Sequence, residues 1–155
     1  MTDFDTLADA LADRYRLDRQ LGQGGMATVY LAHDRKHGRE VAIKILRADV
    51  AESLGRERFL REIQLAARLS HPHILPLYDS GEANGILYFV MPVMQGQTLR
   101  ERMAADAPIS IEEAVRITTE VADALDYAHR HDIVLAAGWL IGRRGRALLW
   151  VVRAD

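Results

Sequence analysis

The stretch Leu21-Gly22-Gln23-Gly24-Gly25-Met26-Ala27-Thr28-Val29-Tyr30 decides how this chain is interpreted, together with Val41-Ala42-Ile43-Lys44 downstream. Glycines allow a backbone to turn tightly over phosphates and to point its N–H groups at them. A lysine on the next strand supplies a point charge for the phosphate oxygens. Two glycines alone are weak support, but their distance from an Ala-Ile-Lys strand, with a glutamate-bearing helix after it, indicates a nucleotide site.

These motifs resemble the small lobe of bacterial serine/threonine protein kinases of the eukaryotic type, and the resemblance runs from about residue 14 to residue 134. It implies an α+β fold, with a five-stranded antiparallel sheet and one helix followed by an incomplete helical large lobe. The family transfers a phosphoryl group from ATP to protein Ser or Thr, with Mg²⁺. The expected parts are an N-terminal helix (1–13), a small lobe (14–91), a hinge (92–97), a partial large lobe (98–134) and an atypical tail (135–155).

The pattern of apolar residues predicts where the elements of this fold lie. Strands are expected at 15–21, 28–33, 40–46, 74–78 and 86–91. Helices are expected over 3–13, from near Ser53 to the His71-Pro72 pair, over 98–104 and over Ile111–Arg130. Ser110 and Glu113 form a capping-box pattern before the last helix. The turn before the fifth strand is expected to contain Gly81, Asn84 and Gly85.

The resemblance assigns residues to the phosphates of ATP. Lys44 would bind them, under a loop formed by Gly22, Gly24 and Gly25. Lys44 would also form an ion pair with a helical glutamate, for which Glu62 fits the family's register better than Glu57. Taken alone, Lys44 is better explained as a solvated surface lysine, and it is the glycine loop upstream that favours the phosphate role. A helical glutamate usually pairs only with local arginines and contributes a few tenths of a kcal/mol.

A second group of residues would hold the adenine ring. The resemblance places the ring between three apolar side chains, which are Leu21, Val29 and Ala42. Met91 would guard the back of this pocket. The hinge would bind adenine through the carbonyl of Pro92 and through the N–H and carbonyl of Met94, and proline serves there because only its carbonyl is needed. The alternative is that these apolar residues simply fill the core of a small sheet.

Composition excludes several other classes of protein. The chain has 155 residues, a net charge of −2 and no cysteine. This charge argues against a nucleic-acid partner, and the lack of cysteine excludes disulfides and thiolate metal sites. No apolar run is long enough to cross a membrane, so a cytoplasmic protein is expected. No metal site is expected, because the histidine pairs lack a second cluster of ligands; these are His33 with His37, His71 with His73, and His129 with His131.

The resemblance stops after Val134. The family continues there with a catalytic loop, His-Arg-Asp followed by Asn, but this chain reads Leu135-Ala136-Ala137-Gly138-Trp139-Leu140. No Asp-Phe-Gly follows, so the family's protein ligands for Mg²⁺ are missing. The tail is rich in Leu, Ala, Gly, Arg, Val and Trp, which suggests GC-rich DNA read out of frame. The alternatives are a genuine ending with a hairpin of 137–142 and 147–152, or, more weakly, a basic patch for nucleic acid.

Two functions of different class follow from this combination. One is the ATP-binding portion of a serine/threonine protein kinase, inactive in phosphoryl transfer as this polypeptide. The other is a non-catalytic interaction module, similar to a pseudokinase, whose partner is an intact kinase chain. The sequence names neither a protein substrate nor a regulatory signal.

Overall fold

The computed structural model describes residues 3–24, 27–48, 57, 63–64, 67–105, 107–132, 136–142 and 147–152, and for the last two ranges it describes the backbone. The chain forms two compact units. The first comprises Met1–Ala67 and Leu77–Val93, and the second comprises Arg68–Pro76 and Met94–Asp155. Each unit has its own sheet.

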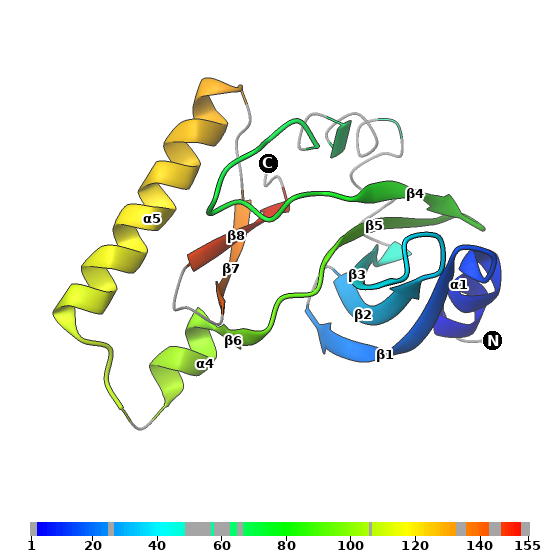
Figure 1. Ribbon diagram of the computed structural model, residues 1–155, viewed down its shortest axis with the longest axis horizontal. Helices are drawn as coiled ribbons and strands as arrows, with labels where there is room; N and C mark the ends of the chain where they lie inside the picture. The colour runs from blue at the N-terminus through cyan, green and yellow to red at the C-terminus, as the bar shows by residue number, and fades with distance from the viewer. Residues whose placement is uncertain are drawn as a thin grey trace. The chain divides into compact units, whose positions relative to one another are not determined.

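The first unit is built on a five-stranded antiparallel sheet (Figure 1). Its strands are β1 (Tyr15–Gln23), β2 (Ala27–Asp34), β3 (Arg39–Leu46), β4 (Asp79–Ala83) and β5 (Ile86–Pro92). They are arranged in the order β1-β2-β3-β5-β4, so β3 lies at the centre. The predicted five-stranded antiparallel sheet is therefore confirmed.

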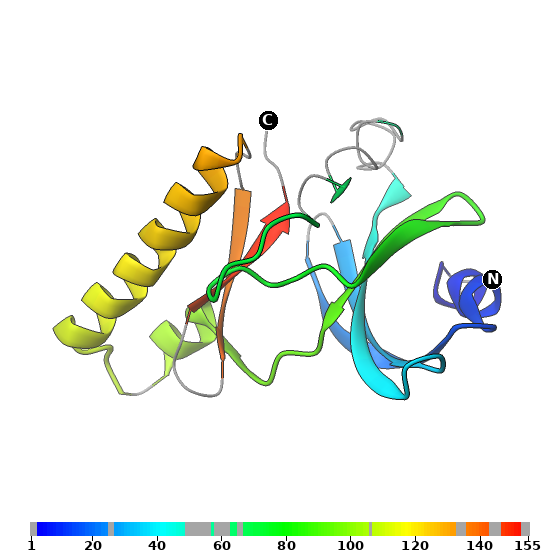
Figure 2. The same cartoon turned by 45° about the horizontal axis from the view of Figure 1, so that its top comes forward.

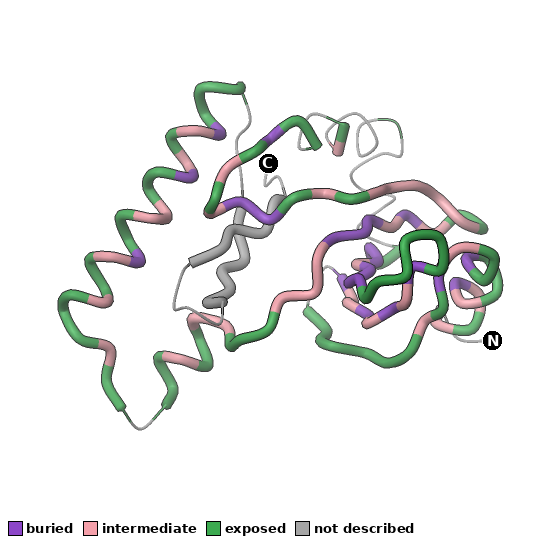
Figure 3. Tube along the Cα trace, viewed as in Figure 1, coloured by how far each residue is buried: buried purple, intermediate pink, exposed green. Residues whose placement is uncertain are grey.

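A helix before the first strand covers one face of this sheet (Figure 2). This helix is α1 (Asp3–Leu11), and its apolar residues recur at helical spacing. Leu7 is 0% exposed and packs in one core with Tyr15, Ile43 and Val90. Figure 3 shows the buried positions on α1 and along the central strands. Burial of its apolar stripe against the sheet explains why so short a helix is stable.

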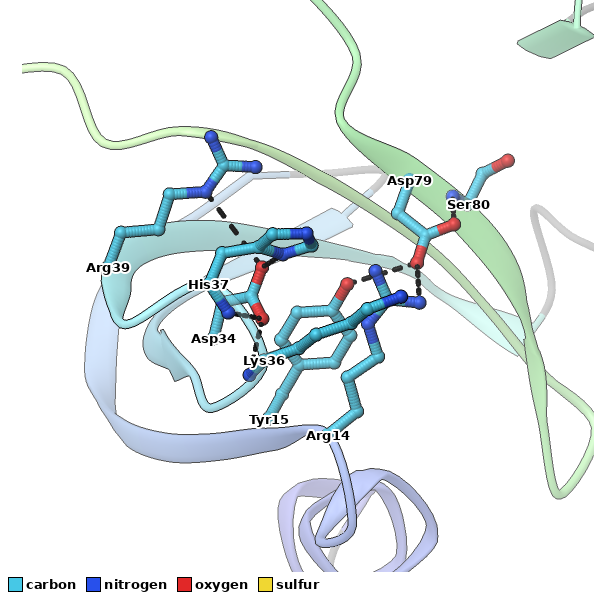
Figure 4. Close-up of polar contacts among 8 residues, drawn as sticks. All are labelled: Arg14, Tyr15, Asp34, Lys36, His37, Arg39, Asp79 and Ser80. Carbon is cyan, nitrogen blue, oxygen red and sulfur yellow. Dashed lines mark hydrogen bonds and ion pairs between the residues drawn. The ribbon is translucent and has the colours of Figure 1, made fainter.

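The turn between β2 and β3 is held by one buried carboxylate (Figure 4). Asp34 is 2% exposed, and its Oδ1 accepts hydrogen bonds from the backbone N–H groups of Lys36 (3.1 Å) and His37 (3.2 Å). Its Oδ2 accepts from Nδ1–H of His37 at 2.7 Å. Burial alone would raise the pKa of Asp34, but the bonds from His37 and Lys36 outweigh it and hold the pKa below its usual value. Gly38 closes the turn with a φ of 62°.

A second polar cluster joins the start of β1 to the start of β4. The Tyr15 hydroxyl donates a hydrogen bond to Oδ2 of Asp79 at 3.0 Å, and Arg14 pairs with the same oxygen at 3.0 Å. Burial and this hydrogen bond raise the pKa of Tyr15. The outer strand β4 is therefore tied to the strand at the opposite edge of the sheet (Figure 4).

The predicted strand at 74–78 is wrong, because β4 begins at Asp79. Pro76 has no N–H to donate to a ladder, which interrupts pairing in this stretch. Ile74 and Leu75 are buried, so their apolar character reflects packing in the second unit rather than strand pairing. Gly81 was also misplaced, since it lies within β4 opposite Tyr88, whose hydroxyl would lie 3.0 Å from an added Cβ. The turn itself is Asn84-Gly85, both with positive φ.

The second unit contains the two predicted helices and a small sheet. The helices are α4 (Leu99–Ala104) and α5 (Ile111–Arg130). In α4, Thr98 and Glu101 form a complete capping box. At α5 the predicted box is only half formed: the Ser110 hydroxyl accepts from the N–H of Glu113, whose carboxylate binds Arg102 at 2.9 Å. None of the helices in the described part of the chain has the length and apolar character needed to cross a bilayer.

The segment before β4 is anchored to α5 inside the second unit. Leu69 and Ile74 pack against Ala124 and Ala128. The hydroxyl of Tyr127 accepts a hydrogen bond from the N–H of Ser70 at 3.2 Å. His71 accepts from the N–H of His73 through Nδ1, so its Nε2–H donates to Asp123 at 3.1 Å. These two histidines therefore hold a loop to a helix.

The tail forms the hairpin that was one of the alternatives from sequence. Strands β7 (Ala136–Gly142) and β8 (Ala147–Val152) pair in antiparallel fashion, and β7 also pairs with β6 (Gly96–Thr98). An altered reading frame concerns the coding DNA, and it stays a prediction. The helix expected from near Ser53, with Glu62 on it, falls mostly outside the described residues.

Replacing Leu7 by Ala is expected to lower the free energy of unfolding by about 2–5 kcal/mol, because it leaves a cavity between α1 and the sheet. Urea denaturation followed by far-UV circular dichroism measures this change. Asp9→Ala is the matched control, since Asp9 is exposed on the same helix and its replacement should cost less than about 0.5 kcal/mol. Equal effects of the two substitutions would show that α1 does not stabilise the sheet.

Candidate functional site

The register of the sheet brings four of the predicted nucleotide residues to one face. Val29 lies opposite Lys44, and Ala42 lies opposite Met91. Residues directly opposite each other in a ladder share a face, and so do residues two apart along a strand. Val29, Ala42, Lys44 and Met91 therefore line the same face. The alternate residues of the central strands, Tyr30, Ile43 and Val90, belong to the core with α1 on the other face.

Lys44 is a cation placed in a largely apolar setting. It is half-buried, and its Nζ lies 5.3 Å from the centroid of the Phe89 ring. Burial lowers the pKa of Lys44 from 10.5 to about 8. Because the folded pKa lies below the unfolded one, charged Lys44 destabilises the fold at neutral pH, and this cost disappears as the pH rises. A negatively charged ligand beside Nζ would offset that cost.

The glycine loop joins β1 to β2 as a hairpin. Gly22 pairs with Val29 in the ladder, and the N–H of Gly24 donates to the carbonyl of Ala27 at 2.8 Å. A Cβ added at Gly22 would meet nothing within 4 Å, and one at Gly24 would meet only the Ala27 carbonyl at 3.8 Å. Internal packing does not explain these two glycines, whereas close approach of a ligand to the backbone would. Gly25 lies outside the described residues.

The remaining adenine residues are less closely gathered. Met91 is 3% exposed within the sheet, and Pro92 is the half-buried last residue of β5. Leu21 is 40% exposed and sits at an irregularity of β1, between Gln20 and Gly22. Met94 belongs to the second unit. The adenine roles of Leu21, Pro92 and Met94 stay predictions.

The described residues fit a nucleotide phosphate better than they fit a metal ion. Lys44 supplies a desolvated cation, and the open glycine backbone leaves space for phosphate oxygens. No group of three or more His, Asp or Glu side chains among the described residues could hold a metal. Glu62, the predicted partner of Lys44, lies outside them. Its ion pair stays a prediction.

Two residues on this face were missed from the sequence. Leu31 lies opposite Ala42, and Phe89 lies opposite Lys44, with its ring beneath the ammonium group. The signal was available in the period-two alternation of β2 and β5, because Leu31 follows Val29 and Phe89 precedes Met91 by two positions. Both extend the apolar surface around Lys44.

Known proteins are similar to this chain in sequence and in fold. A family described as "Protein kinase domain" matches residues 15–136. The serine/threonine-protein kinase PrkC of Bacillus subtilis is 45% identical over 125 residues, which covers 80% of this chain and 19% of that protein. PknB of Mycolicibacterium smegmatis is 45% identical over 134 residues, covering 83% and 21%. The chain thus spans about a fifth of the length of these curated relatives.

A solved structure agrees with the sequence matches. The crystal structure of the Mycobacterium tuberculosis PknI kinase domain superposes with a TM-score of 0.78 at 35% identity, covering 87% of this chain and 58% of that one. The five-stranded sheet with the helices that follow it is the small lobe and the start of the large lobe of that fold. By sequence and by structure, this chain belongs to the protein kinase domain family.

Proposed function

We propose that this chain is the ATP-binding portion of a serine/threonine protein kinase. One observation carries the proposal: Lys44 lies on the sheet face away from α1, together with Val29, Ala42 and Met91. These four residues form what we call the nucleotide face. It combines an apolar surface suited to an adenine ring with one half-buried cation suited to phosphate. Its relatives PrkC and PknB carry the name serine/threonine-protein kinase, which supports the same assignment.

Binding would use groups that this chain supplies itself. The ammonium of Lys44 would donate to phosphate oxygens, and their negative charge would restore its pKa toward the ordinary value. The backbone around Gly22 and Gly24 would approach the phosphates closely, because no Cβ intervenes. Mg²⁺ would supply further neutralisation of phosphate charge in the family, but the described residues provide no cluster of carboxylates for it.

Phosphoryl transfer is not part of the proposal for this polypeptide. The family orients the substrate hydroxyl with an aspartate of the catalytic loop and holds metal with an asparagine and a second aspartate. Residues 135–155 contain one carboxylate side chain, Asp155, and no asparagine. We therefore propose weak nucleotide binding without catalysis. The proposal places this activity in the cytoplasm, where ATP is available.

A second candidate is a non-catalytic module that binds an intact kinase. The observation that favours it is the self-contained character of the first unit, which has its own sheet and its own core with α1. Such a unit can present a surface without performing chemistry. Stabilisation of this chain by an intact kinase, with no effect of nucleotide, would favour this candidate over the first.

Nucleotide binding is expected to depend on Lys44. Mg·ATP should raise the thermal midpoint of the chain, and Lys44→Ala should abolish the rise. Differential scanning fluorimetry over a range of ATP concentrations measures this. The sequence has one other lysine, Lys36, which is exposed and lies outside the nucleotide face, so Lys36→Ala should respond like the unmodified chain. An ATP-induced rise that survives Lys44→Ala would refute the assigned role.

The affinity for nucleotide is expected to fall as the pH rises above 8. In the chain without nucleotide the pKa of Lys44 is about 8, and bound phosphates would raise it, so binding must take up a proton at pH values between the two. The affinity should then drop by up to about tenfold per pH unit. Calorimetry in buffers of different ionisation enthalpy reports the proton uptake. Lys44→Arg should remove the pH dependence, and no proton uptake by the unmodified chain would contradict this expectation.

The polypeptide is expected to show no protein kinase activity. Incubation with radiolabelled ATP, Mg²⁺ and a general substrate such as myelin basic protein should give no more incorporated phosphate than the Lys44→Ala variant. The reason is the lack of the catalytic-loop and metal-binding residues after Val134. Incorporation that requires Lys44 would show that the 155-residue chain is a working enzyme.

A further inference from the structure

The turn between β2 and β3 carries an unusual density of positive charge. Residues 35–39 read Arg-Lys-His-Gly-Arg, and all five are exposed. Arg14 joins them, because its carbonyl accepts a hydrogen bond from the N–H of Arg35 at 2.9 Å. We call the side chains of Arg14, Arg35, Lys36, His37 and Arg39 the cationic corner; Figure 4 shows four of them around Asp34 and Tyr15.

The described acidic groups nearby engage Arg14, His37 and Arg39 but do not balance the charges of Arg35 and Lys36. Asp34 is 2% exposed, and its oxygens are taken up by the turn. Asp79 is engaged by Arg14 and by the Tyr15 hydroxyl. Glu40 lies opposite His33 in the ladder, whereas Arg39 lies opposite Asp34, so Glu40 and Arg39 point to opposite faces of the sheet.

The turn does not require the positive charges of Arg35 and Lys36. Its geometry comes from the Asp34 carboxylate and from Gly38. The side chains of Arg35 and Lys36 form no hydrogen bond or ion pair with the part of the chain that the structure describes. Neutral polar residues would form the same turn without the mutual repulsion of adjacent positive charges. A negatively charged partner would explain why the cations are there.

The corner is also rigid, which favours binding. Two N–H groups and the ring of His37 are fixed on Asp34, and Arg39 stacks on the ring of Tyr78 with Cζ 3.7 Å from its centroid. A surface already held in one conformation loses little entropy when it binds. Guanidinium groups match carboxylates with two parallel hydrogen bonds.

We propose that the cationic corner is a docking surface for an acidic, Asp/Glu-rich segment of a partner protein, distinct from the nucleotide face. A protein partner fits better than the other polyanions. Single-stranded nucleic acid binds largely by stacking its bases on exposed aromatic rings, and Arg39 already covers the ring of Tyr78 beside the corner. Residues 35–39 include no apolar side chain that could insert into a membrane surface.

The test uses the full chain and a fluorescein-labelled oligoglutamate peptide, followed by fluorescence anisotropy at low and at physiological salt. Binding should weaken as salt increases. The charge-reversal variant Arg35→Glu/Lys36→Glu should weaken it by roughly tenfold or more, because two charge-assisted contacts become repulsive. The matched control is Arg100→Glu/Arg130→Glu, which changes the net charge equally at exposed positions of the second unit and should retain the affinity within about twofold.

Folding of both variants is checked by circular dichroism and thermal midpoint, and Arg35→Glu/Lys36→Glu should leave the midpoint unchanged because Asp34 and Gly38 are kept. Equal loss in both variants would overturn the proposal, since it would show only general electrostatic attraction. Tighter binding of single-stranded RNA or of anionic phosphatidylserine vesicles than of oligoglutamate would also overturn it in favour of those partners. If oligoglutamate does not bind even at low salt, the proposed docking surface is refuted.

Discussion

β3 pairs along both of its edges, with β2 and with β5, and this double pairing determines what the rest of the first unit can do. Because successive side chains of a strand point to opposite faces, the register divides β3 into two sets. Val41, Ile43 and Ile45 enter the core under α1, while Ala42 and Lys44 face the other way. A slip of one residue would exchange the two sets and put Lys44 into the core. The apolar set therefore positions the cation, since burying it in the wrong register costs far more than any local preference could supply.

The position of Lys44 is a compromise between stability and binding. An ammonium group at a mostly apolar surface loses hydration, which is why its pKa falls to about 8. The Phe89 ring beneath it returns part of that loss through its negative face. A fully solvated lysine would stabilise the fold better but would gain little from a phosphate, because water screens the interaction. The same desolvation that weakens the free protein strengthens the attraction for an anion.

Most of the fold could be predicted from the sequence, because local patterns and tertiary burial agree there. The alternation in β2 and the apolar stripe of α5 each identify an element and its buried side. The predictions of individual elements were wrong where a local sequence pattern had a different structural cause. Ile74 and Leu75 were predicted to form a strand, yet both are buried outside β4, and Ile74 packs against α5. Gly81 read as a turn residue, yet it makes room for Tyr88. Strand period explains why Val29, Ala42, Lys44 and Met91 share a face of the sheet. Phe89 was missed because an aromatic residue in a strand is usually assigned to the core.

The two units differ in how completely their apolar side chains are buried within the unit. In the first, α1 closes one face of the sheet, and the carboxylates of Asp34 and Asp79 are hydrogen-bonded within the unit. In the second, large apolar side chains remain open: Ile111 is 80% exposed, Val115 60% and Met103 63%. Exposed apolar groups of this size on neighbouring turns of a helix usually meet a partner surface. The four residues of the proposed nucleotide face, Val29, Ala42, Lys44 and Met91, belong to the first unit, whereas phosphoryl transfer in this family draws on residues beyond the hinge. The proposed nucleotide binding and the proposed lack of catalysis therefore depend on different parts of the chain, and each needs its own test.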